Sequence, residues 1–125
     1  MKYENIPGVP DFLCNECAPK ATKYCILVPI INEGERIANE LRRAQENGID
    51  KLCDILICDG GSKDGSTELE KMKALGVNTL LTKTGAGKQG AQLRMGIWFA
   101  LKRGYDGVIT IDGNDKEHRR RAAIY

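Results

Sequence analysis

Aromatic residues are scarce in this chain, and it has no long apolar segment. Phe, Tyr and Trp make up 6% of its 125 residues, so it offers no stacking platform for single-stranded nucleic acid. The net charge of +2 is too small to attract a nucleic acid. A membrane-spanning helix needs about 20 apolar residues, and neither such a run nor the apolar core of a signal peptide is found. These absences predict a cytoplasmic protein that neither binds nucleic acid nor spans a membrane.

Histidine is also scarce, which limits the metal sites that the cysteines could complete. Cys14 and Cys17 have the spacing of half a zinc site, but no second CxxC pair follows, and His118 is the only histidine. A closed zinc site needs four ligands, so we do not expect structural zinc. The other three of the five cysteines lie in or beside apolar runs, where cysteine behaves as a small buried residue. We therefore expect no disulfide.

Apolar periodicity predicts strands that alternate with helices. Strands are expected at residues 24–31, 54–58, 77–82 and 108–112, and helices at residues 35–47, 67–75 and 90–103. On the last helix, the apolar side is expected to consist of Leu93, Ile97, Trp98 and Leu101. This alternation predicts an α/β fold, a three-layer sandwich in which helices cover both faces of a mostly parallel sheet.

The chain divides into three predicted parts. Residues 1–22 contain three prolines and no sustained periodicity, and we expect an irregular arm that packs across the domain through Phe12 and Leu13. Residues 23–117 form the predicted α/β domain. Residues 118–125 carry a run of arginines and are expected to be a solvated basic tail.

Polar residues follow the predicted strands. Asn32 and Glu33 follow the first strand, and Asp59 opens the glycine-rich stretch D-G-G-S-K-D-G-S after the second. Glycines let a backbone turn tightly and approach a ligand closely. The alternative is an ordinary strand-to-helix connection with Asp64 as the helix cap. Because ligands of open parallel sheets bind beyond the carboxyl ends of the strands, we favour a binding site.

The segment after the third strand has two interpretations. Gly85, Gly87 and Gly90 fit G-x-G-x-x-G, with Asp112 after the next strand, which would indicate a nicotinamide-dinucleotide-binding Rossmann domain of an oxidoreductase. The same segment also places backbone N–H groups at a helix start near Lys88 and Arg94, a suitable setting for a diphosphate.

Oxygen ligands cluster after the fourth strand. Asp112, Asn114 and Asp115 suit Mg²⁺ or Mn²⁺, which proteins hold through one or two side chains together with substrate phosphates. A neutral amide such as that of Asn114 offers an oxygen but no anionic charge. Either Asn114 or Asp115 could therefore complete a site that begins with Asp112.

Together these motifs resemble the family 2 glycosyltransferases, inverting enzymes of the GT-A fold that use nucleotide-diphosphate sugars. Residues 29–33 read P-I-I-N-E and look like the family's P-x-x-N-E. Residues 57–66 look like its V-V-D-D/G-G-S-T-D-G-T, and residues 87–96 like its G-x-x-x-A-x-x-x-G. Residues 112–114 occupy the place of its D-x-D metal motif. The resemblance covers about residues 24–117.

The resemblance implies which residues bind the donor. Asp59 is expected to hold the base and ribose, and Asp59→Ala to abolish donor binding while leaving the fold intact. The expected nucleotide-binding residues are Pro29, Asn32, Glu33, Asp59, Gly61, Ser62, Lys88 and Arg94, and the expected metal ligands are Asp112, Asn114 and Asp115. The acceptor, a sugar or a lipid carrier, stays open, as does membrane association of a longer form.

The resemblance also implies that this chain carries only the donor-binding half of the enzyme. Members of the family continue through an acceptor-binding half that carries the general base, which we expect beyond Tyr125. We therefore expect this chain to bind the donor without efficient transfer. The alternatives are the Rossmann oxidoreductase domain and a non-catalytic α/β domain that binds a protein.

Overall fold

A computed structural model describes the backbone of residues 1–114 and 119–124 and the side chains of residues 1–111. The strands are β1 (Lys2–Tyr3), β2 (Phe12–Glu16), β3 (Tyr24–Ile30), β4 (Asp54–Asp59), β5 (Thr79–Lys83), β6 (Gly107–Asn114) and β7 (Arg119–Ile124). The helices are α1 (Glu35–Glu46), α2 (Ile49–Leu52), α3 (Leu69–Ala74) and α4 (Gln89–Arg103). No helix in the described part of the chain is long and apolar enough to cross a membrane.

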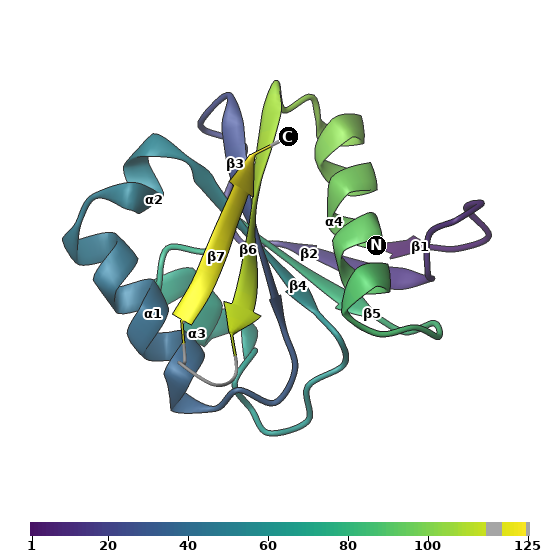
Figure 1. Cartoon of the computed structure of the whole chain (residues 1–125), viewed down its shortest axis with the longest axis horizontal. Helices are drawn as coiled ribbons and strands as arrows, with labels where there is room; N and C mark the ends of the chain where they lie inside the picture. The colour runs from purple at the N-terminus through teal and green to yellow at the C-terminus, as the bar shows by residue number, and fades with distance from the viewer. Residues whose placement is uncertain (115–118, 125) are drawn as a thin grey trace.

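The strands form one sheet in the order β1-β2-β5-β4-β3-β6-β7. The four central strands, β5, β4, β3 and β6, are parallel, whereas β1, β2 and β7 add to the two sides in antiparallel pairing. Figure 1 shows α1, α2 and α3 on one side of this sheet and α4 on the other. The predicted α/β fold with a mostly parallel sheet between helices is confirmed, and it is consistent with a Rossmann-like fragment of a GT-A fold.

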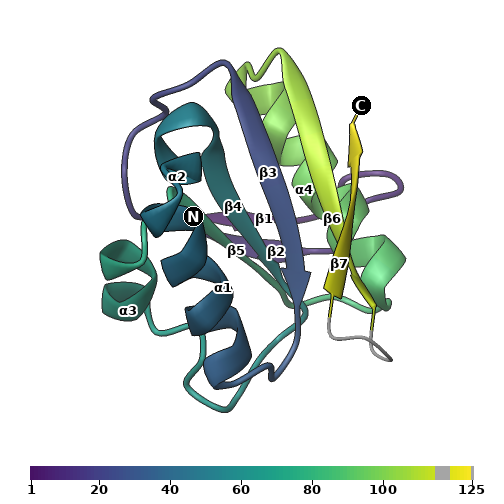
Figure 2. The same ribbon diagram turned by 60° about the vertical axis from the view of Figure 1, so that its left-hand side comes forward.

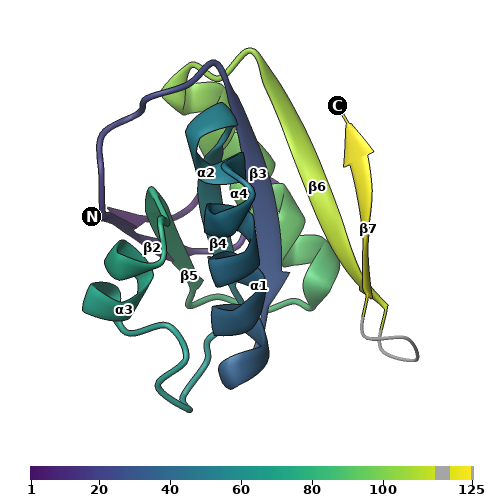
Figure 3. The ribbon, with the colours of Figure 1, turned by 90° about the vertical axis from the view of Figure 1, so that its left-hand side faces the viewer.

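Each face of the sheet carries its own apolar core. Successive residues of a strand point to opposite faces, so Leu27 belongs to the core under α4, whereas Ile26 and Val28 belong to the core under α1 and α3. This explains why the β3 run is apolar at almost every position. Figure 3 shows α1 and α2 in front of β3 and β4, with β6 and β7 beside them.

The α4 helix forms where expected, but its predicted apolar side is wrong. Leu101 is 67% exposed, and the face against the sheet consists of Ala91, Gln92, Met95, Gly96, Phe99 and Ala100. The reason is close packing. A Cβ on Gly96 would lie 2.5 Å from the Cys58 sulfur and 3.0 Å from Leu27 Cδ1, so the helix comes close to the sheet at this glycine. Ile97 and Trp98 pack at the margin of that core.

The predicted irregular arm contains two strands. Phe12 is 1% exposed, as expected of a packing residue, and β2 pairs along β5 over five residues. The Tyr3 ring stacks on Phe12 at 4.9 Å and meets the Trp98 ring edge-on at 5.3 Å. The pairing was missed because both strands are short and join a distant edge of the sheet through backbone groups. The predicted domain limits at residues 22 and 117 stay predictions.

The predicted solvated tail also contains a strand. The backbone of β7 runs antiparallel to β6, with Asp112 opposite Arg121 and Asn114 opposite Arg119. Figure 2 shows the two strands side by side. A ladder uses the backbone N–H and C=O groups that arginine shares with every residue except proline, so the arginine run carried no signal against pairing. His118 and Tyr125 lie outside the described residues.

All five cysteines are free thiols, as expected. Burial raises the pKa of Cys58 and, to about 12, that of Cys25. Both thiols are therefore uncharged near neutral pH and act as small apolar core residues. Among the described residues, no group of histidine, cysteine and acidic side chains could hold a metal ion, so Cys14 and Cys17 gain no zinc-site partners there.

Candidate functional site

A pocket of about 390 Å³ lies where β3 and β4 end and α4 begins. This volume is within the range of small-molecule sites. Its apolar part comes from Pro29, Ile30 and Ile31 at the end of β3, and Gly60 and Gln92 also line it. The pocket therefore occupies the carboxyl edge of the parallel strands, where the sequence predicted a ligand.

The loop after β4 is organised by Asp59. This aspartate is 1% exposed, and its Oδ1 accepts hydrogen bonds from Gly61 N at 3.1 Å, Ser62 N at 2.9 Å and Ser62 Oγ at 2.7 Å. Its Oδ2 accepts one from Thr67 Oγ1 at 3.1 Å. Within the described structure, the carboxylate is thus engaged by its own loop. Asp59, Gly61 and Ser62 lie together beside the pocket, and Gly60 forms part of its wall.

Hydrogen bonds join this loop to the turn after β3. Asn32 N donates to Ser62 Oγ at 2.8 Å, and Asn32 Oδ1 accepts from Lys63 N at 2.8 Å. Gly34 N donates to Asp64 Oδ2 at 3.1 Å. Hydrogen bonds from Ser66, together with the one from Gly34, lower the pKa of Asp64. Asp64 is not a helix cap, because α3 begins only at Leu69. Hydrogen bonds through Ser62 connect Asn32 to Asp59.

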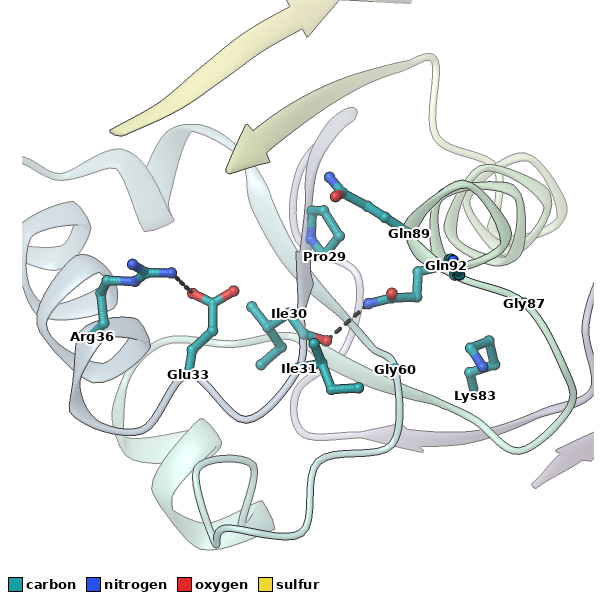
Figure 4. A pocket seen from close by; sticks show the side chains of 11 residues that line it. Pro29, Ile30, Ile31, Glu33, Arg36, Gly60, Lys83, Gly87, Gln89 and Gln92 are labelled. Carbon is teal, nitrogen blue, oxygen red and sulfur yellow. Dashed lines mark hydrogen bonds and ion pairs between the residues drawn. The ribbon is translucent and has the colours of Figure 1, made fainter. Parts of the chain in front are cut away.

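Gln92 was not predicted as a site residue. It lies on the buried face of α4, is 5% exposed, and its Nε2 donates to the carbonyl oxygens of Ile30 and Cys58, each at 2.8 Å. It thus ties the carboxyl ends of β3 and β4 to the helix, as Figure 4 shows for Ile30. A buried polar residue needs partners, so a glutamine on the core face of a helix was the signal that could have revealed it.

Charged side chains line opposite walls of the pocket. Figure 4 shows Glu33 and Arg36 on one side and Lys83 on the other. Arg36 Nη2 lies 3.5 Å from Glu33 Oε1, and Lys83 Nζ donates to the Gly85 carbonyl at 2.9 Å. Lys88 also lines the pocket and is exposed. The pocket can accept a ligand that has an anionic end toward the lysines.

The amino end of α4 adds to this cationic wall. Gly87, Lys88 and Gln89 line the pocket at the start of a 15-residue helix. The first backbone N–H groups of a helix have no partners within it, and they favour an anion there. Gly87 has φ +122°, and a Cβ at this position would lie 2.4 Å from Ala91 Cβ. The sharp entry into the helix therefore requires glycine.

Arg94 does not line the pocket. Its Nε donates to the carbonyl of Gly8, in the loop between β1 and β2, at 3.0 Å. Of the expected nucleotide-binding residues, the structure brings Pro29, Glu33 and Lys88 to the pocket wall, places Asn32, Asp59, Gly61 and Ser62 beside it, and turns Arg94 toward the amino-terminal segment. Lys83 and Arg36, which line the pocket, were missed.

The expected metal ligands lie outside the described side chains. The backbones of Asp112 and Asn114 belong to β6, which continues beyond the predicted strand end at residue 112, and Asp115 lies outside the described residues. The metal site therefore stays a prediction.

The structure does not support the interpretation of G-x-G-x-x-G as a dinucleotide-binding motif. Its glycines follow β5, which lies two strands from β3 in the sheet. In that motif the third glycine allows close packing of helix against strand. Here a Cβ on Gly90 would meet Arg94 Nη1 at 3.6 Å, an ordinary contact, and the close approach occurs at Gly96 instead.

Comparison with known proteins finds a similarity to a glycosyltransferase. No protein-family model matches the chain, and neither does a solved structure. The chain is similar to glycosyltransferase AglJ of Haloferax volcanii, with 31% identity over 96 residues. The matched stretch is 77% of this chain and 29% of that protein, so the chain corresponds to less than a third of the relative's length. In coarse terms, the similarity supports a glycosyltransferase.

Proposed function

We propose that this chain is the donor-binding part of a family 2 glycosyltransferase of the GT-A type, which transfers a sugar from a nucleotide-diphosphate sugar with inversion. The observation that carries the proposal is the pocket at the carboxyl ends of β3 and β4, closed on one side by Lys83, Lys88 and the start of α4. The four sequence motifs and the similarity to a glycosyltransferase support it.

The wall charges suggest how a donor would lie. The diphosphate would face Lys83, Lys88 and the amino end of α4, because these groups favour negative charge. The nucleoside would lie toward Glu33 and the Asp59 loop, beside the apolar residues of β3. In this arrangement Asp59 acts by fixing the loop that contacts the nucleoside, since its own oxygens already accept four hydrogen bonds.

Asp112 with Asn114 or Asp115 would hold Mg²⁺ or Mn²⁺, a proposal that rests on the sequence motif alone. When bound, such an ion neutralises negative charge on a departing diphosphate. The general base and the acceptor, a sugar or a lipid carrier, are assigned to no residue of this chain. Location in the cytoplasm, and at a membrane for a longer form, are parts of the same proposal.

Thermal unfolding with a panel of nucleotides tests the proposed function. UDP, GDP and NAD are each added at millimolar concentration, with and without Mn²⁺. A ligand present at 100 times its dissociation constant stabilises by about 2.7 kcal/mol. We expect UDP or GDP to raise the melting temperature, and Mn²⁺ to increase that rise.

Two results would contradict the proposal. A rise with NAD alone that disappears in Asp112→Ala would favour the Rossmann oxidoreductase domain. No rise with any nucleotide would favour the non-catalytic interaction domain.

A further inference from the structure

The loop that carries Lys88 is held by the amino-terminal segment. This loop, residues 84–88, connects β5 to α4. Its first two backbone N–H groups, those of Thr84 and Gly85, both donate to the carbonyl of Asp11, at 2.9 and 3.0 Å. Asp11 directly precedes β2, which pairs with β5. The pocket loop thus depends on a segment that lies more than seventy positions earlier in the chain.

The amino-terminal loop, residues 4–11, is held in place by hydrogen bonds within the loop and by one from α4. Asn5 N donates to Asp11 Oδ1 at 3.1 Å, which closes the loop on itself, and Val9 N donates to the Ile6 carbonyl at 3.1 Å. Arg94, on α4, donates from Nε to the Gly8 carbonyl at 3.0 Å. Figures 1 and 2 both show the β1–β2 loop beside α4.

The space around Gly85 shows how closely the two loops approach each other. Its backbone does not need a left-handed φ, yet a Cβ there would lie 2.8 Å from the backbone nitrogen of Asp11. A backbone atom cannot move aside as a flexible side chain can. Any larger residue at position 85 would therefore push the amino-terminal loop and the pocket loop apart.

We propose that the amino-terminal segment, residues 1–16, supports the binding site: it fixes the loop that follows Lys83 and carries Lys88, and Arg94 is a positioning residue that acts through Gly8. The inference rests on the proposed function. It gives Arg94 a different role from the expected diphosphate ligand, because its Nε is already engaged by a carbonyl away from the pocket.

Amide hydrogen exchange and calorimetry of the full chain together test this role. The variants are Arg94→Ala and Gly85→Ala. The matched controls are Arg42→Ala, which removes an exposed helical arginine that donates to the Asn39 side chain, and Lys51→Ala, which removes an exposed charge from α2. Arg94 is exposed, so its replacement leaves the core intact.

In the absence of nucleotide, we expect the Thr84 and Gly85 amides to exchange about tenfold faster in both variants, the factor that corresponds to about 1.4 kcal/mol. Core amides of β3 and β4 should exchange at unchanged rates. Affinity for UDP or GDP should fall by about fivefold in both variants, a change of about 1 kcal/mol. Arg94→Lys should recover part of the loss, and the controls should match the unchanged protein.

The outcomes separate three roles. Loss of affinity in Arg94→Ala with unchanged exchange at Thr84 and Gly85 would make Arg94 a direct ligand and overturn the inference. Faster exchange with unchanged affinity would make the amino-terminal segment merely structural, which also overturns it. If the unchanged protein binds neither UDP nor GDP, the proposed function fails and with it the segment's part in binding, whereas the exchange rates still decide whether Arg94 and Gly85 hold the two loops together.

Discussion

Asp59→Ala is expected to lower the free energy of unfolding by about 3 kcal/mol and to remove nucleotide binding. The carboxylate is buried and accepts four hydrogen bonds from its own loop. Hydrogen bonds to a charged group contribute about 1.5–3 kcal/mol, and donors left unpaired in a buried setting add to the loss. Urea denaturation measures the first effect and calorimetry with UDP and GDP the second. The structure thus replaces the expectation, drawn from the sequence, that this variant keeps its fold intact.

The control for Asp59→Ala is Asp106→Ala, which removes an exposed carboxylate. We expect it to change the free energy of unfolding by less than about 0.5 kcal/mol, as substitutions at exposed positions usually do. Asp59→Asn keeps the size but turns an NH₂ group toward donors, so it should recover little. Full stability of Asp59→Ala together with lost binding would mean that the carboxylate contacts the nucleoside and that its bonds to the loop contribute little.

Gln92→Leu is expected to lower the free energy of unfolding by about 2 kcal/mol, because two buried hydrogen bonds from the side chain to backbone carbonyls are lost. Those bonds hold the ends of β3 and β4 at the pocket, on the carbonyls of Ile30 and Cys58. Affinity for UDP or GDP should fall with stability. Gln92→Glu should destabilise further, since a carboxylate would replace a donor that faces two carbonyl oxygens.

Gln45→Leu is the matched control for Gln92→Leu. Gln45 Nε2 also donates to a backbone carbonyl, that of Ala74 at 3.1 Å, but it does so at the surface. We expect a loss below about 1 kcal/mol there. Equal losses at the two positions would show that Gln92 has no special part in holding the strand ends.

Much of the fold could be predicted because its central elements are locally encoded. The β3 run is apolar on both faces, and Ile37 and Leu41 mark the buried side of α1. The outer strands could not be predicted in this way. Pairing of β2 with β5 and of β7 with β6 depends on backbone groups from distant parts of the chain, and such contacts leave no local pattern.

The site was predictable where residues act at a strand end and unpredictable where they act across elements. Glu33 lies in the short connection after β3 and Lys88 directly precedes α4, and both line the pocket. Gln92 acts from the core face of a helix, and the partner of Arg94 belongs to a loop whose position only the sheet determines. The buried face of α4 was predicted wrongly for a related reason. The close approach of α4 to the sheet at Gly96 follows from tertiary packing.

The most direct test of the proposed site is calorimetric titration of UDP and GDP into the unchanged protein, Lys88→Gln and Lys102→Gln. Lys102 lies near the end of α4, the helix that Lys88 precedes, over the Trp98 ring. It is not among the pocket residues and controls for the loss of one charge. We predict one binding site for at least one of the two diphosphates, with affinity reduced about tenfold in Lys88→Gln, or about 1.4 kcal/mol, and unchanged in Lys102→Gln. Equal affinity in Lys88→Gln and the unchanged protein, or no binding of either diphosphate at millimolar concentration, would contradict the account.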